Sequence, residues 1–168
     1  GDDQITTGGG ADTIHANGGD DTVTISTATG NSNPIDGGAE SSADTLKLVD
    51  AAVDTSKFNN VVDLSDNNNN ELQGSADLTK LINFEDVDAG QLTGDNAVTL
   101  VGSNTANTLK GGAGADEITG GGGADIMSAG SDSANDVFII NAGDSSDGSE
   151  DKIQYFDTAN DTIKLTGD

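Results

Sequence analysis

The chain has 168 residues and a formal net charge of −24, from 30 acids against six lysines and no arginine. This charge makes nucleic acid and anionic membrane surfaces poor partners and makes a cation the natural one. Only 32% of the residues are hydrophobic and 3% aromatic, and there is no cysteine. A single domain of this length therefore needs a staple other than a large core or disulfides.

The first predicted elements are three short repeats in residues 1–24. Glycines, acids and apolar residues each recur there every nine residues. The three columns are Gly1, Gly10 and Gly19; Asp3, Asp12 and Asp21; and Ile5, Ile14 and Val23. A flexible linker has no reason to keep such a register, so the columns predict a repeat architecture. Residues 35–49 fit one further repeat with an insertion, which places Asp44 in the acid column.

The middle of the chain, residues 49–92, departs from this pattern. The segments TLKLV, NVVDLS and AVTLV, in and beside it, alternate apolar and polar residues as strands do. We expect a loop at 67–71, and a short helix over 75–82 because Ser75 can cap it. The region is therefore predicted to be irregular and rich in β-structure.

A second repeat block runs over residues 93–141. Its apolar column is Leu100, Leu109, Ile118 and Met127, and its acid column is Val98, Asn107, Asp116 and Asp125. The next repeat is two residues longer and restores an acid at Asp136 and an apolar residue at Phe138. The remainder, 142–168, is predicted to cap the structure, with two short strands around a polar turn in 151–165. Phe138, Tyr155 and Phe156 are expected to close that end.

Geometry explains why the repeat needs these residue types. In GGAGADEIT, a six-residue turn precedes a three-residue strand, of which only the middle residue points inward. Glycine is needed because a tight turn requires positive φ. Two repeats make one coil of 18 residues, so turns one coil apart stack. This arithmetic places Asp3 over Asp21, Asn107 over Asp125 and Asp116 over Asp136.

Stacked carboxylates repel one another unless a cation lies between them. Carboxylates and turn carbonyls form an all-oxygen cage, which suits calcium better than magnesium. With no cysteine and one histidine, a zinc or copper site lacks ligands.

The glycine runs lack the spacing of a dinucleotide-binding loop. DSSDGSED, at 144–151, lacks the alternating acids of an EF-hand and is expected to be a solvated or capping loop, although Asp147 and Asp151 could hold an edge ion. His15 is expected to be exposed, and no nucleophile motif accompanies it, so we do not expect an enzyme.

TGGGADTIH, GGAGADEIT and GGGGADIMS resemble the calcium-binding nonapeptide repeat of the RTX (repeats-in-toxin, hemolysin-type) family, G-G-x-G-x-D-x-U-x. ANGGDDTVT matches its second half, and the C-terminal DKIQYFDTANDTIKL is similar to the segment that follows such repeats in type I secreted proteins. The resemblance covers about 1–24 and 107–140, extends less closely to 35–48 and 151–165, and fades over 49–92. It implies an all-β fold, a right-handed parallel β-roll or β-solenoid with calcium-binding glycine-rich turns.

The resemblance also assigns metal ligands. The acid positions are Asp3, Asp12, Asp21, Asp116, Asp125, Asp136 and, after the insertion, Asp44. The turn carbonyls are those of Gly8, Gly10, Gly19, Gly112, Gly114, Gly121 and Gly123. Asn107 stands where the motif has Asp, and the weakest site is expected there. Asp12 faces Gly30 one coil later, so its site is expected to be incomplete.

The expected function follows from linkage. Without calcium the acids repel and the small core cannot offset chain entropy, so folding should require several calcium ions. We expect one module, made of blocks 1–48, 49–92, 93–141 and 142–168, from a larger secreted bacterial protein. The parent is either an adhesin or surface-layer protein, or a type I secreted enzyme (protease, lipase or alginate epimerase) that carries the module as a non-catalytic part. The partners are calcium and neighbouring modules or copies at the surface of a Gram-negative cell, with no direct membrane insertion.

Overall fold

The computed structural model describes residues 1–8, 12–25, 34–38, 43–49, 58–65, 70–74, 79–146 and 148–167, with the backbone alone at 58–60, 70–74 and 79. All regular structure in these ranges is β-strand. These ranges contain no helix that is long and apolar enough to cross a membrane. The strands of the N-terminal half are β1 (Gln4–Thr6), β2 (Ile14–His15), β3 (Thr22–Ile25), β4 (Ile35–Asp36), β5 (Thr45–Val49), β6 (Phe58–Asp63), β7 (Asn70–Gly74) and β8 (Thr79–Ile82). Those of the C-terminal half are β9 (Asp86–Gln91), β10 (Thr99–Val101), β11 (Thr108–Lys110), β12 (Glu117–Thr119), β13 (Ile126–Ser128), β14 (Val137–Asn141), β15 (Lys152–Gln154) and β16 (Thr162–Thr166).

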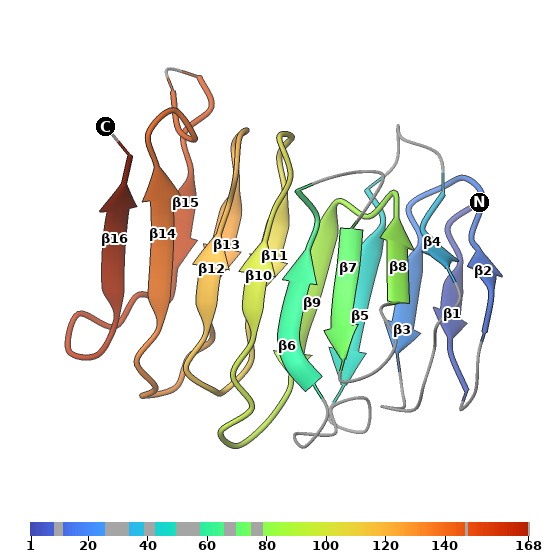
Figure 1. Cartoon of the computed structure of the whole chain (residues 1–168), viewed down its shortest axis with the longest axis horizontal. Helices are drawn as coiled ribbons and strands as arrows, with labels where there is room; N and C mark the ends of the chain where they lie inside the picture. The colour runs from blue at the N-terminus through green and yellow to red at the C-terminus, as the bar shows by residue number, and fades with distance from the viewer. Residues whose placement is uncertain are drawn as a thin grey trace.

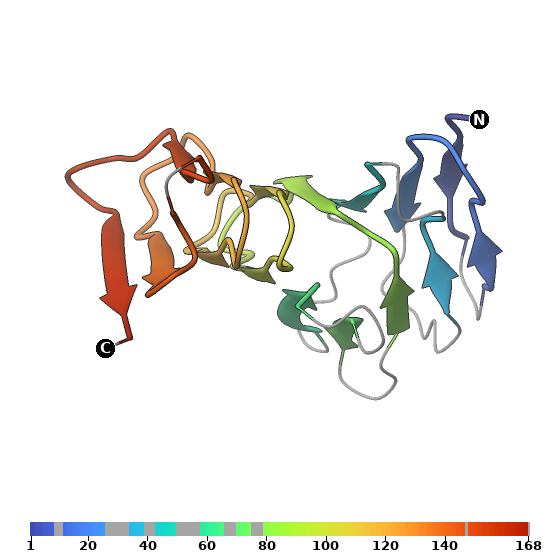
Figure 2. The same cartoon turned by 90° about the horizontal axis from the view of Figure 1, so that it is seen from above.

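The strands form two sheets that the chain visits in turn. The first sheet has the order β1-β3-β5-β9-β11-β13-β15, and the second has the order β16-β14-β12-β10-β6-β7-β8-β4-β2. Apart from β6, β7 and β8, successive strands alternate between the sheets, so each pair of strands is one coil (Figure 1). Viewed from above, the sheets are two facing layers that run from the N-terminus to the C-terminus (Figure 2). The all-β fold with parallel strands agrees with the prediction.

The strand register confirms the predicted coil where the repeats are regular. Gln4 pairs with Thr22 and Thr99 with Glu117, each across one coil of 18 residues. Elsewhere insertions lengthen the coil without breaking the parallel pairing. The steps are 23 residues from Asp21 to Asp44 and 26 from Asp125 to Asp151. Insertions are therefore absorbed in the turns, while strand pairing fixes the register.

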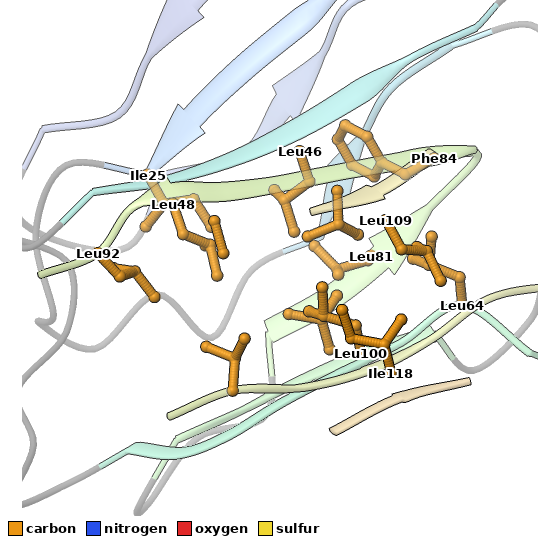
Figure 3. Packing of buried hydrophobic residues seen from close by; sticks show 14 of the residues in the cluster. Ile25, Leu46, Leu48, Leu64, Leu81, Phe84, Leu92, Leu100, Leu109 and Ile118 are labelled. Carbon is orange, nitrogen blue, oxygen red and sulfur yellow. The ribbon is translucent and has the colours of Figure 1, made fainter. Parts of the chain in front are cut away.

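The core is a row of apolar side chains between the two sheets (Figure 3). In β11 and β12 only the central residues, Leu109 and Ile118, are fully buried, as predicted from strand alternation. Each stacks on its counterpart in the next coil, since Leu109 pairs with Met127 and Ile118 with Phe138. One or two such residues per strand suffice, which explains the low apolar content.

The middle region adds strands to the second sheet only. β6 and β7 pair antiparallel, as do β7 and β8, while β5 pairs directly with β9 in the first sheet. The three predicted strand segments are confirmed as β5, β6 and β10. The predicted helix over 75–82 is wrong, because Thr79–Ile82 is strand β8; residues 75–78, including Ser75, lie outside the described ranges. Cross-strand pairing with Ile35 and Asp36 outweighs the weak capping signal.

The predicted loop at 67–71 is also wrong in its described part, because Asn70 and Glu71 begin β7. The tail forms the two expected strands, β15 and β16. Phe138 is buried and its ring centroid lies 6.0 Å from that of Phe156. Tyr155, predicted to help close this end, is instead 69% exposed, because its backbone lies in the left-handed region just after β15.

Candidate metal centre

A column of mostly acidic residues stands immediately before the strands of the first sheet. We call it the first ladder; its members are Asp3, Asp21, Asp44, Glu85, Asn107, Asp125 and Asp151. The main-chain N–H of Asp3 donates to Oδ1 of Asp21 at 2.6 Å, and that of Asp21 donates to Oδ1 of Asp44 at 2.8 Å. Each of these carboxylates therefore accepts a hydrogen bond from the backbone of the preceding coil.

The same contact continues toward the C-terminus. The N–H of Asp44 donates to Oε2 of Glu85 at 2.8 Å, that of Asn107 to Oδ1 of Asp125 at 2.8 Å, and that of Asp125 to Oδ1 of Asp151 at 3.1 Å. The stacking predicted for Asp3 over Asp21 and for Asn107 over Asp125 is confirmed.

A second ladder precedes the C-terminal strands of the second sheet. It consists of Val98, Asp116, Asp136 and Asp161. The N–H groups of Val98 and Asp116 donate to Oδ1 of Asp116 and Asp136, both at 2.8 Å. The N–H of Asp136 donates to Oδ1 of Asp161 at 3.2 Å. The predicted stacking of Asp116 on Asp136 is confirmed, and Asp161 extends it by one coil.

Three ladder carboxylates and Asp12, which lies just before β2, keep one buried oxygen without a hydrogen-bond partner among the described residues. The atoms are Oδ2 of Asp12, Asp21, Asp125 and Asp151. Asp21 is only 1% exposed and Asp125 is fully buried, yet neither takes part in an ion pair in the described part of the chain. A buried anionic oxygen without a partner is costly, so these atoms fit a bound cation.

Two further carboxylates, Asp116 and Asp161, lie in turns of a different kind, which we call closed. In a closed turn the second side-chain oxygen accepts the N–H of the residue four positions earlier. Oδ2 of Asp116 accepts that of Gly112 at 2.8 Å, and Oδ2 of Asp161 accepts that of Asp157 at 2.7 Å. In this conformation, both oxygens of each carboxylate already accept a backbone N–H.

The turns before Asp21 and Asp125 we call open. Four residues before these acids lie Asn17, with φ of 80°, and Gly121, with φ of 88°, both left-handed. Gly112, at the same place in its repeat, is outside the left-handed region. The nearly identical sequences 111–116 and 120–125 thus form one closed and one open turn, and of the two only the open turn leaves a carboxylate oxygen without a hydrogen bond.

Asn107 interrupts the row of charges in the first ladder. Its Nδ2 donates to the carbonyl of Glu85 at 2.5 Å, and its Oδ1 accepts the N–H of Ser103 at 2.7 Å. The side-chain amide of Asn107 therefore makes hydrogen bonds at the place where a cation would bridge two acids. This agrees with the expectation that the position of Asn107 is the weakest site, which itself stays a prediction.

The family comparison bears directly on this geometry. The RTX calcium-binding nonapeptide repeat matches in four copies, over residues 1–24 and 101–133. The chain carries RTX calcium-binding repeats. The matched residues contain both open turns, and calcium is the cation that this family binds. No curated protein matches the chain.

The structure places most of the predicted RTX ligands but tests none as ligands. Asp3, Asp21, Asp44, Asp116, Asp125 and Asp136 all lie in the two ladders. Gly19, Gly112, Gly114, Gly121 and Gly123 lie in the turns, Gly8 and Asp12 precede β2, and Gly10 lies outside the described residues, as does Gly30. Coordination by the turn carbonyls stays a prediction. No three acidic or histidine side chains of the described residues converge into a ready cage, so carbonyls would have to complete any site.

Three acidic ladder members were not among the ligands that the resemblance assigns. Glu85, Asp151 and Asp161 each follow an insertion, so no spacing of nine points to them. The available signal was local: each acid directly precedes a short segment with strand character. For Asp151 the sequence predicts only a place in a solvated or capping loop, where it could hold an edge ion with Asp147. His15 is exposed as expected, with Nδ1 3.3 Å from Oδ2 of Asp36.

The electrostatics of the RTX turns oppose ionisation without a cation. Burial, reinforced by the charge of Asp136, raises the pKa of Asp116 from 3.8 to about 7. Burial, reinforced by the charge of Asp151, raises the pKa of Asp125 to about 6. Hydrogen bonds from backbone N–H groups oppose both shifts without cancelling them. A bound calcium ion would reverse this balance by stabilising the charged form.

Proposed function

We propose that this chain is a calcium-binding structural module whose folding depends on calcium, shaped as a right-handed parallel β-roll. The observation that carries the proposal is the buried, unpartnered Oδ2 of Asp21 and of Asp125 in the open RTX turns. Calcium accepts carboxylate and carbonyl oxygens in irregular geometry, which such a turn can offer. Ion binding would then supply folding free energy that the thin core does not.

The role we propose is non-catalytic and extracellular. The buried acids of the described residues, Asp21, Asp44, Asp116, Asp125 and Asp136, all belong to the ladders, so none is set aside for chemistry. RTX repeats typically occur in secreted proteins, which supports a secreted or cell-surface location. A chain that stays unfolded at low calcium would suit passage through a type I secretion channel of a Gram-negative cell.

For the parent protein we favour an adhesin or surface-layer protein. The two repeat blocks are separated by β6, β7 and β8, which extend the second sheet as a rigid spacer would. Neighbouring modules or further copies would be its partners. The alternative is the accessory module of a secreted protease, lipase or epimerase. The rest of the parent sequence decides between them: further repeats support the first, and a catalytic domain supports the second.

Calorimetric titration with calcium tests the site directly. We expect Asp21→Asn to lose one bound ion or to bind it roughly tenfold more weakly, because the amide removes the charge from the unpartnered oxygen. Asp20→Asn is the matched control, since Asp20 is the exposed neighbour and undergoes the same chemical change. Equal binding by both variants would contradict the assignment.

A further inference from the structure

The first ladder extends beyond the RTX match to Asp151, at the end of the loop between β14 and β15. The register pairs Ile126 with Lys152, so the preceding residues, Asp125 and Asp151, stand on adjacent coils. Their direct link is the N–H of Asp125, which donates to Oδ1 of Asp151 at 3.1 Å. The RTX match ends at residue 133, so Asp151 belongs to no matched repeat.

Both carboxylates of this pair keep a buried oxygen without a partner. Asp125 is fully buried; its Oδ1 accepts the N–H of Asn107 and its Oδ2 accepts no hydrogen bond. Oδ2 of Asp151 is equally buried and unpartnered. Asp144, another acid of the loop, accepts hydrogen bonds from the N–H and Nδ2 of Asn141, and its negative charge adds to the repulsion felt by Asp125.

No cationic side chain of the described residues pairs with either acid. Lys152, the nearest lysine in sequence, is exposed. Two charged oxygens on adjacent coils, both shielded from water, are therefore left to be satisfied from outside the protein. Carboxylates of this kind, supplemented by loop carbonyls or water, suit a hard divalent cation.

We propose that Asp125 and Asp151 together hold a calcium ion that fastens β15 to the last RTX repeat. This inference rests on the proposed function and adds to the site at Asp125 a ligand, Asp151, from outside the matched repeats. The ion would replace the repulsion between the two acids with a bridge, and β15 would then keep its parallel pairing with β13. Ile153 and Phe156, which pack against the core, would be held in place with it.

The rate of trypsin cleavage after Lys152 reports on this site, because Lys152 lies in β15 and is exposed. In saturating calcium chloride we expect Asp151→Asn to bind one ion fewer and to be cut after Lys152 at least tenfold faster than the wild type. The asparagine still offers Oδ1 to the N–H of Asp125, so only the charge is lost. Cleavage after Lys110, within the repeats, should stay at the wild-type rate.

Glu150→Gln is the matched control, since Glu150 is the exposed neighbour of Asp151 and loses the same charge. It should keep the wild-type ion count and cleavage rates. An unchanged ion count and unchanged protection of Lys152 in Asp151→Asn would overturn the inference while leaving calcium binding by the repeats intact. A wild type that binds no calcium would overturn the proposed function itself, and the inference with it.

If trypsin also cuts Asp151→Asn faster than the wild type after Lys110, the variant is misfolded. The inference is then tested on the wild type by NMR. Manganese prefers the same oxygen ligands and broadens the NMR signals of nearby amides. Manganese bound to the wild type should broaden the amide signals of Asp151 and Lys152. Sharp signals at both residues, with broadening elsewhere in the repeats, would overturn the inference.

Discussion

At the scale of single residues, the decisive atoms are the second carboxylate oxygens of the ladder acids. Where a turn is closed, as at Asp116, a backbone N–H satisfies this oxygen. Where a turn is open, as at Asp125, the oxygen is buried and without a partner. The open turns thus present an unpartnered oxygen to an ion, whereas an ion at Asp116 would share the carboxylate oxygens with the N–H groups of Val98 and Gly112.

The raised pKa values predict opposite effects of pH with and without calcium. The pKa of Asp116 lies near 7 and that of Asp125 near 6 in the folded chain, above the ordinary value of 3.8. In chelator, the folded state therefore binds protons more tightly than the unfolded state. Any calcium-free structure should lose stability as pH rises from about 4 to about 7.

Calcium binding should show the reverse dependence, because the ion needs ionised carboxylates. We expect the calcium concentration at the midpoint of folding to be lower at pH 7.5 than at pH 5.5. Titrations followed by circular dichroism at the two pH values measure it. A midpoint that is the same, or lower at pH 5.5, would show that these acids are not ligands.

Among the turn glycines, Gly121 and Gly122 provide a matched pair. Gly121 has φ of 88°, and a Cβ there would lie 2.1 Å from the carbonyl oxygen of Ser103. Gly122 is outside the left-handed region, and its nearest neighbour would be 3.6 Å away. Gly121→Ala should lower the free energy of unfolding by more than the roughly 1–2 kcal/mol that a left-handed alanine costs, because the steric clash adds to that cost.

Gly122→Ala should be neutral or slightly stabilising, since it reduces only the freedom of the unfolded chain. Urea unfolding of both variants in calcium measures the free energies of unfolding. Equal stabilities would mean that the open turn is not built as described.

At the scale of elements, the strands carry the core in a single row. Leu100 in β10 is fully buried, whereas Leu165 in β16, the edge strand of the same sheet, is 77% exposed. Leu100→Ala should cost about 2–5 kcal/mol, as large-to-small changes in packed cores do. Leu165→Ala should change stability by less than about 0.5 kcal/mol.

Thermal or urea unfolding in saturating calcium compares the two leucine variants. A small loss of stability in Leu100→Ala would mean that calcium alone, without the row of apolar side chains, holds the coils together. That result would contradict the two-part account of stability.

The elements also show what could be predicted from sequence. Spacing of nine predicted β11, β12 and β13, their inward residues and the stacking of Asn107 on Asp125, because glycine, acid and apolar columns kept one register. The insertions removed that register, so the ladder positions of Glu85, Asp151 and Asp161 were missed. Strand β8 was mistaken for a helix because Thr79–Ile82 carries no periodic signal strong enough to reveal its partners in β4.

The difference between open and closed turns lies beyond sequence reasoning. GGAGAD and GGGGAD both satisfy the motif, and only the backbone angles separate them. Those angles depend on which coil each turn meets: a Cβ at Gly114 would meet Asn96 and Ala97, and one at Gly123 would meet Thr105 and Ala106.

At the scale of the whole molecule, the two ladders differ in continuity. The first ladder crosses the middle region, because β5 pairs with β9 and Asp44 donates to Glu85. The second sheet receives β6, β7 and β8 in the same interval, which separates Asp12 from the second ladder, Val98 to Asp161. Calcium on the first ladder could therefore link both repeat blocks, whereas the second ladder serves the C-terminal block.

The net charge of −24 opposes any compact state unless cations offset it, so folding of the whole chain should depend on calcium. Far-UV circular dichroism in calcium and in excess chelator, with magnesium as the matched divalent control, tests this most directly. We expect a β-rich spectrum in calcium and a largely disordered one in chelator, with magnesium unable to replace calcium. A β-rich spectrum that is unchanged in chelator would contradict it.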